Sequence, residues 1–231
     1  MRILIKISGE ALSNHTGNNY DFDYLQKIWK EIQILQKTHQ IAIVCGGWNI
    51  CRGAEFAKNG ISPTVGHEVG MLATTMNALI LADIIEKFGS QTIVYTARDL
   101  SGIGEIFDAK RVKNSLDAGA IVFLSGGTGH PYFSTDTASV LRSLELSCEM
   151  MIKCTSVDGI YSADPKKDPT AQKLESVTYG DILTKNLRIM DQASIALARD
   201  HDLKIGVCHI DTLPSLTSLE KGDFSGSVIG K

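Results

Sequence analysis

The chain has 231 residues, a net charge of -3 and Lys and Arg spread along its length. This length suits one α/β domain, residues 1–231, and the dispersed charge excludes the concentrated basic surface of a nucleic-acid-binding protein. The N-terminus lacks a signal peptide, and no apolar run approaches the ~20 residues of a membrane span, so we expect a cytoplasmic protein without membrane contacts.

Short apolar stretches alternate with amphipathic ones along the chain. The apolar stretches predict strands at 2–8, 41–45, 91–95, 120–125, 150–155 and 204–210. The amphipathic ones predict helices at 22–37, 70–88, 108–120, 136–146 and 191–202, with Asp136 and Asp191 as helix N-caps. The alternation favours a three-layer αβα sandwich around an open, mainly parallel sheet. The 70–88 helix is apolar on more than one side and suits a subunit interface.

The five cysteines are odd in number and form no CxxC pair. They are Cys45, Cys51, Cys148, Cys154 and Cys208. Most lie in apolar, strand-like runs, which favours buried free thiols over disulfides or a metal site.

A lysine interrupts the first predicted strand, in "KISGE" at 6–10. Lys6 lies between Ile5 and Ile7, so either it protects an edge strand from aggregation or its ammonium group meets a ligand. Gly9 would then leave room for that ligand against the backbone.

The second predicted strand ends in "CGGWNICRGA". Gly46 and Gly47 expose backbone N–H groups, a helix start behind them would favour an anion, and Arg52 offers a planar set of donors for phosphate oxygens. The alternative is a Gly-Gly turn with a solvated arginine.

A third glycine-rich segment, "LSGGTGHPYFSTDTA" at 124–138, follows a predicted strand and precedes a helix. This is a second anion-binding pattern. Thr128, His130, Tyr132 and Phe133 offer polar and stacking contacts to a base or sugar. Two such segments indicate two phosphorylated ligands.

The segment at 153–171 is rich in turn formers. A surface loop explains Asp158, Gly159 and Pro165. Tyr161 is different, because an aromatic residue among turn residues often covers a flat ligand. No GxxxxGK[ST] motif occurs, so a phosphoryl-transfer enzyme of this sequence is not a P-loop enzyme.

Together these segments resemble the bacterial uridylate (UMP) kinases of the amino acid kinase family. The resemblance runs from "ILIKISGEAL" through "GGWNICRGA", "VGHEVGMLATTMNAL", "SGGTGHPYFSTDTA" and "TSVDGIYSADPKKDPTA" to "MDQASIALARDH". It implies the amino acid kinase fold and transfer of the ATP γ-phosphoryl group to UMP, with Mg²⁺ accompanying ATP and no metal site of the protein's own. It also implies a homo-oligomer, typically a hexamer, inhibited by UTP and, in many members, activated by GTP; activation by GTP stays open for this sequence.

The resemblance also implies site residues. Those implied for catalysis are Lys6, Arg52 and Asp191, the last ordering the catalytic lysines and the metal. Those implied for ATP are Lys6, Ile7, Ser8, Gly9, Gly47, Arg52, Thr155, Tyr161 and Asp164. Those implied for UMP are Gly46, His67, Glu68, Thr128, Gly129, His130, Pro131, Tyr132, Phe133, Ser134 and Thr135.

The sequence departs from the family pattern at three places. Trp48 replaces a third glycine, Ser156 replaces a common lysine, and His67 with Glu68 replaces an aspartate-histidine pair. Either His67 or Glu68 is expected to hold the UMP ribose. Two other functions stay open: a carboxylate or carbamate kinase of the same fold, which forms an acyl phosphate, and a regulator that senses nucleotides without turnover.

Overall fold

A computed structural model describes residues 1–13, 18–51, 56, 58–163, 165, 167–184, 187, 189–211 and 224–231. Of the residues expected in the site, Arg52 and Asp164 lie outside these ranges.

The described residues form strands and helices in an alternating order. The strands are β1 (Arg2–Ile7), β2 (Gln40–Cys45), β3 (Thr92–Thr96), β4 (Glu105–Ile106), β5 (Ile121–Ser125), β6 (Met150–Thr155), β7 (Ile160–Tyr161), β8 (Lys173–Leu174), β9 (Ser176–Thr178), β10 (Lys204–His209) and β11 (Ser227–Gly230). The helices are η1 (Gly9–Leu12), α1 (Phe22–Gln36), α3 (Pro63–Glu86), α4 (Ala109–Asp117), α5 (Thr135–Glu145), α6 (Tyr179–Thr184) and α7 (Gln192–Asp200).

Within the described ranges, nine strands form one sheet in the order β4-β3-β5-β2-β1-β6-β10-β11-β9. Neighbouring strands run parallel except β10 and β11, which are antiparallel. Because β1 lies at the centre, Lys6 is not on an edge strand, and that explanation of the lysine is wrong.

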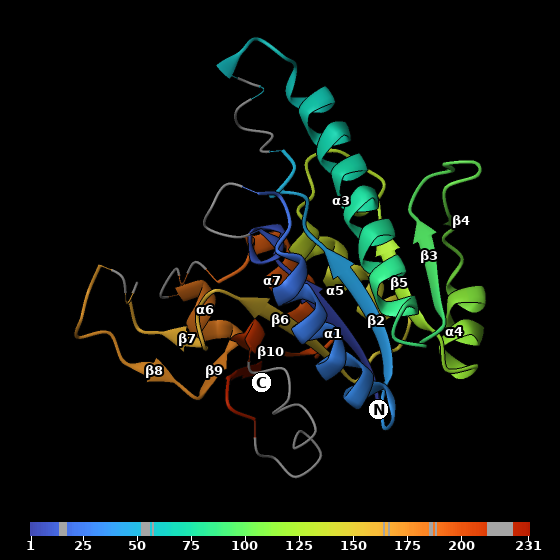
Figure 1. Cartoon of the computed structure of the whole chain (residues 1–231). Helices are drawn as coiled ribbons and strands as arrows, with labels where there is room; N and C mark the ends of the chain where they lie inside the picture. The colour runs from blue at the N-terminus through green and yellow to red at the C-terminus, as the bar shows by residue number, and fades with distance from the viewer. Residues whose placement is uncertain are drawn as a thin grey trace.

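Helices cover both faces of the sheet (Figure 1). On one face α1 and α3 pack their apolar side chains on Ile3, Ile5, Ile43 and Phe123. On the other face α4, α5, α6 and α7 cover Leu4, Val44, Val122 and Met151. The expected αβα sandwich with a mainly parallel sheet is confirmed.

The long helix α3 begins earlier than the sequence predicts, at Pro63 instead of residue 70. Ser62 caps it by accepting a hydrogen bond from Val65 N, and proline is favoured in a first helical turn. By length and composition α3 could cross a membrane, contrary to expectation. Half of that apolar stretch is buried inside this fold.

The cysteines are free thiols, and all except the half-buried Cys51 are buried. Burial raises the pKa of the Cys45 and Cys148 thiols to about 12. These thiols are therefore unreactive core residues.

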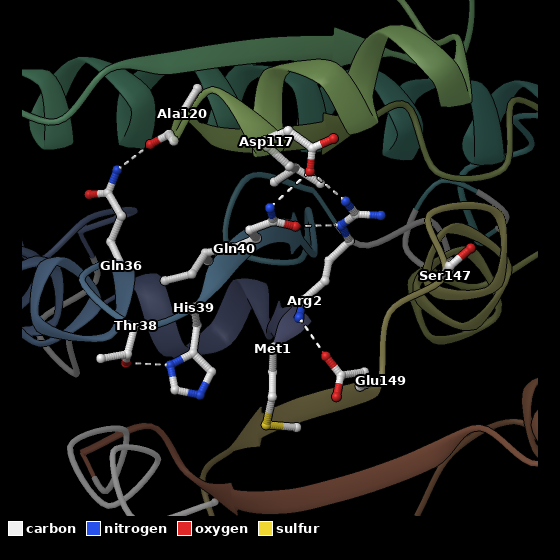
Figure 2. A pocket seen from close by; sticks show the side chains of 13 residues that line it. Met1, Arg2, Gln36, Thr38, His39, Gln40, Asp117, Ala120, Ser147 and Glu149 are labelled. Carbon is white, nitrogen blue, oxygen red and sulfur yellow. Dashed lines mark hydrogen bonds and ion pairs between the residues drawn. The ribbon is translucent and has the colours of Figure 1, made fainter.

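The amino ends of the central strands meet at a cavity of about 570 Å³ (Figure 2). The Arg2 guanidinium extends across it and donates to Gln40 Oε1 (2.8 Å), Leu146 O (2.7 Å) and Asp117 Oδ1 (2.9 Å). Gln40 donates to the same Asp117 oxygen (2.9 Å). This network joins β1 and β2 to α4 and the end of α5 at the amino ends of the strands. The glycine-rich loops that follow β1, β2 and β5 lie at the opposite, carboxyl ends.

Candidate active site

Two buried lysines face one aspartate at the centre of the sheet. Lys6 of β1 and Lys153 of β6 are register partners on adjacent parallel strands, and both are buried. Lys6 Nζ lies 3.0 Å from Asp136 Oδ1, and Lys153 Nζ lies 2.5 Å from Asp136 Oδ2. Lys153 also donates to Ile189 O (2.7 Å). Two ammonium groups therefore share the Asp136 carboxylate.

The ion pairs fix the charges of these groups. Burial opposes ionisation of Asp136, but the ammonium groups of Lys6 and Lys153 outweigh it and hold the pKa of the Asp136 carboxyl below its usual value. Burial lowers the pKa of Lys153, an effect that Asp136 counteracts and the charge of Lys6 reinforces. Two ammonium groups side by side at the carboxyl ends of parallel strands suit an anionic ligand, although the charge of Asp191 also acts on Lys153.

The sequence suggested that Asp136 caps α5, but it does not. Ser134 is the N-cap: its Oγ accepts from Asp136 N (3.0 Å) and Thr137 N (3.1 Å). Asp136 stands instead in the first helical turn, which leaves its carboxylate for the lysines. The expectation failed because Ser134, Thr135 and Asp136 are all plausible caps in sequence.

Asp191 caps α7, as predicted, by accepting from Ser194 N (3.0 Å). It also accepts from Ser134 Oγ (2.5 Å) and Thr137 Oγ1 (2.9 Å). These bonds join the starts of α5 and α7 beside the two lysines. Asp191 therefore fits an ordering role.

The carboxylates of this centre are already engaged by other groups of the protein. Nowhere in the described ranges do three His, Cys, Asp or Glu side chains gather as metal ligands. Asp136 is neutralised by two lysines and Asp191 is hydrogen-bonded by three groups. This set fits Mg²⁺ that arrives on substrate phosphates, since Mg²⁺ commonly binds through one or two carboxylates plus phosphate oxygens.

The strand ends after β1 and β2 pack tightly on each other. A Cβ at Gly9 would lie 2.5 Å from Trp48 N, and one at Gly46 would lie 2.8 Å from Gly9 N. The space beside Gly9 is thus filled by backbone, contrary to the expectation that it leaves room for a ligand. Ser8 precedes η1 without capping it, and the Ile7 side chain is buried in the core.

The loop after β2 is fastened to α3. A Cβ at Gly47 would lie 2.9 Å from Ala73 Cβ. Buried Asn77 of α3 donates to Gly46 O (2.6 Å) and to Asn49 Oδ1 (2.8 Å). Gly47 O accepts from Ile50 N (3.0 Å) and Cys51 N (3.1 Å) and closes a turn. The helix expected behind this turn falls largely on residues 52–55 and 57, which lie outside the described ranges.

The loop between β5 and α5, residues 126–134, leads directly into the lysine centre; we call it the acceptor loop. Gly126, Gly127 and Gly129 have φ of 77°, 60° and 82°, a left-handed conformation that glycine adopts without strain. Thr128 Oγ1 donates to His130 O (3.3 Å), and Pro131 is half-buried. Tyr132 and Phe133 are exposed.

The first half of α3 lies against the acceptor loop. Thr74 Oγ1 accepts from Gly126 N (2.8 Å), and the His67 ring lies 4.8 Å from that of Tyr132. Glu68 is paired with Arg98 (3.4 Å). The structure thus brings His67 and Glu68 beside 128–134, as the sequence implied, but each already has a protein partner.

On the other side of the centre, a turn follows β6. Thr155 Oγ1 donates to Val157 O (2.8 Å) and accepts from Val157 N (3.0 Å). Tyr161 donates to Asp158 Oδ1 (2.7 Å), which fixes its ring on the β7–β8 hairpin. Thr155 is therefore the last residue of β6, two residues after Lys153, and Tyr161 lies in β7 just after the turn.

Sequence reasoning missed four residues of this region: Lys153, Thr137, Asn77 and Arg98. Lys153 carries the signal that singled out Lys6, a lysine between apolar residues in a predicted strand. Asn77 and Thr137 give no comparable signal, because polar residues are ordinary in amphipathic helices.

Comparisons with known proteins agree with this arrangement. Residues 1–209 match the amino acid kinase family. The chain is 43% identical over 226 residues to a uridylate kinase of Sulfurovum sp. (strain NBC37-1), covering 97% of this chain and 96% of the relative. It is 38% identical over 229 residues to a uridylate kinase of Escherichia coli O1:K1 / APEC, covering 99% and 95%. The crystal structure of UMP kinase from Bacillus anthracis superposes with a TM-score of 0.95 at 32% identity, covering 99% of this chain and 95% of that one.

Proposed function

The chain belongs to the amino acid kinase family, and we propose that it is a UMP kinase, which transfers the γ-phosphoryl group of ATP to UMP to give UDP and ADP. One observation carries the proposal: the buried side chains of Lys6 and Lys153 both pair with Asp136. This centre lies between the glycine-rich loops at the carboxyl ends of the strands. Full-length similarity to uridylate kinases favours UMP over a carboxylate or carbamate acceptor.

Phosphoryl transfer requires positioning and charge neutralisation more than covalent chemistry. Lys6 and Lys153 would neutralise the charge on the oxygens of the transferring group, and Asp136 holds both ammonium groups in place beforehand. A phosphate monoester has a second pKa near ~6, so UMP is mainly a dianion at neutral pH and needs no general base. Mg²⁺, carried by ATP, would supply further neutralisation of its phosphate charge.

We assign the acceptor loop, Gly46 and the start of α3 to UMP. We assign Ser8, the backbone of Gly9, Gly47, Thr155 and Tyr161 to ATP, with Arg52 and Asp164 expected to contribute. The exposed Tyr132 and Phe133 rings would cover the uracil base. The single domain would act within a cytoplasmic homo-oligomer, a hexamer inhibited by UTP.

An assay of ADP release with ATP, Mg²⁺ and a panel of acceptors tests the proposal. We expect turnover with UMP, much less with CMP, and none with aspartate or acetylglutamate. Lys6→Met is expected to abolish turnover and to leave the Kd of UMP nearly unchanged, because the lysine acts mainly on the transferring group.

Two results would contradict the proposal. Turnover of a carboxylate would indicate an acyl-phosphate-forming kinase. Binding of UMP and ATP without turnover would indicate a nucleotide sensor.

A further inference from the structure

Arg98, just beyond β3, contacts two other segments that border the acceptor site. Its Nε donates to the carbonyl oxygen of Gly129 (2.6 Å), and its Nη1 lies 3.4 Å from Glu68 Oε1. Gly129 belongs to the acceptor loop and Glu68 to the second turn of α3. One guanidinium therefore links β3, the acceptor loop and α3.

The backbone around Arg98 is well anchored. Thr96 is fully buried and donates to Arg98 O (2.7 Å), and Ala97 N donates to Ser125 O (2.9 Å), which continues the pairing of β3 with β5. Beyond Ser125 the acceptor loop stays close to Ala97, since a Cβ at Gly129 would lie 3.3 Å from Ala97 O, and the Arg98 side chain adds a hydrogen bond to this part of the loop. The guanidinium is thus held where the backbone pairing ends.

The acceptor loop needs such a fastening. Gly129 has φ 82°, and Tyr132 has φ 70°, a left-handed conformation that is unfavourable for a tyrosine. A loop with these angles keeps its shape only when its surroundings hold it. Thr74 holds one end at Gly126, Ser134 is fixed at the start of α5, and Arg98 holds the middle.

The Arg98–Glu68 pair contributes little to global stability, because both side chains are about half exposed (50% and 46%). The pair instead helps to fix the conformation of the acceptor loop. We propose that Arg98 is a positioning residue for UMP, which keeps the acceptor loop in its binding shape. This inference rests on the proposed function. Glu68 then acts through Arg98, by orienting its guanidinium, and not on the ribose.

The test compares Arg98→Gln with a matched control, Arg111→Gln. Arg111 forms an exposed ion pair with Glu105 of β4 and has no contact with the acceptor loop in the described structure. We expect Arg98→Gln to raise the KM of UMP about tenfold or more, with kcat and the KM of ATP within about twofold of wild type. Arg111→Gln is expected to change none of these, and both variants to keep the wild-type Tm within about 2 °C.

Two further variants separate the contacts of Arg98. Arg98→Lys keeps the charge but loses the planar fork that reaches Gly129 and Glu68 together, so it is expected to recover only part of the UMP affinity. Glu68→Gln is expected to raise the KM of UMP only about threefold, and by the same factor for 2′-deoxy-UMP. If Glu68 instead bound the ribose 2′-hydroxyl, its loss would matter for UMP and not for 2′-deoxy-UMP, and the role given to Glu68 would be wrong.

The inference is overturned if Arg98→Gln and Arg111→Gln have the same KM for UMP. It is also overturned if Arg98→Gln lowers the Tm strongly and raises both KM values, since that marks a general structural defect. A wild-type protein that turned over no UMP would overturn the proposed function first, and this inference with it.

Discussion

Asp136 is the only carboxylate that faces Lys6 and Lys153 at ion-pair distance in the described residues. Removing its charge would leave two ammonium groups buried side by side, with only the more distant carboxylate of Asp191 to offset them. Breaking a buried ion pair in this way typically costs about 3–5 kcal/mol. We expect Asp136→Asn to lower the free energy of unfolding at pH 7 by that amount, as measured by urea denaturation.

We also expect the destabilisation caused by Asp136→Asn to depend on pH. The folded-state pKa of Asp136 is lowered below the usual 3.8, so its stabilisation is complete above that value and is lost as the pH falls through the folded-state pKa. The stability difference between wild type and Asp136→Asn should therefore shrink below about pH 4. Asp117→Asn is the control: Asp117 is paired with Arg2 but exposed, and we expect a cost of about 1 kcal/mol or less. A gap that stayed constant to acid pH would contradict the ionised state of Asp136.

Sequence reasoning at single residues succeeded where a side chain conflicted with its surroundings. Lys6 was found because a charge in an apolar strand needs a partner. Lys153 shows the same conflict between Ile152 and Cys154 and could have been found in the same way. Arg98 could not, because an exposed arginine in a loop conflicts with nothing, and its contacts with Gly129 and Glu68 depend on the folded arrangement.

At the scale of elements, the turns after β1 and β2 depend on glycine for packing. Alanine at Gly9 would place a Cβ 2.5 Å from Trp48 N, a backbone atom that a rotamer change cannot move. We expect Gly9→Ala to destabilise the protein by about 1–3 kcal/mol, as overpacking does, and to raise the KM of ATP. Urea denaturation and steady-state kinetics measure the two effects.

Gly70→Ala is the matched control for this prediction. Gly70 lies within α3, and a Cβ there would meet nothing within 4 Å. Alanine in a helix is expected to stabilise the protein by about 0.5–1 kcal/mol. If Gly9→Ala did not lower the free energy of unfolding either, the two strand ends would not be packed as tightly as described.

Central elements were predictable and peripheral ones were not. Six strands and five helices were expected close to where they lie, because apolar periodicity is strong where both faces of a sheet are covered. The missed strands, such as β4 and β11, are short and lie at or near the edges of the sheet, where pairing with a neighbour decides their form. The early start of α3 was readable in Ser62 followed by Pro63, a common helix-start pattern.

At the scale of the whole molecule, the amino ends and the carboxyl ends of the parallel strands carry different groups. At the amino ends, Arg2 is paired with Asp117 beside a cavity (Figure 2), whereas at the carboxyl ends Lys6 and Lys153 meet at Asp136. Ligands of open α/β sheets bind beyond the carboxyl ends of strands. The start of α3 extends over these carboxyl ends (Figure 1), so one helix reaches both the site and the outer surface.

The outer face of α3 bears a stripe of exposed apolar side chains. Val65, Leu72, Met76 and Leu79 are 38% to 50% exposed and follow one another at seven, four and three residues, the spacing of a helix–helix contact. An apolar stripe of this kind marks an interaction surface. If the protein is the proposed homo-oligomer, α3 is the element most suited to bury it against a second copy.

A charge in the middle of that stripe should weaken the assembly. We expect Met76→Glu to shift the mass measured by sedimentation velocity from the oligomer to a smaller species, because an unpaired carboxylate would be buried in an apolar contact. Ile34→Glu is the control, since Ile34 is equally apolar and 45% exposed but lies on α1, outside the stripe. Identical masses for wild type and Met76→Glu would show that copies of this chain associate through another surface. The lysine centre is formed by β1, β6, α5 and α7 of a single chain, so we expect it to work within one subunit. A smaller Met76→Glu species with unchanged kcat would confirm this.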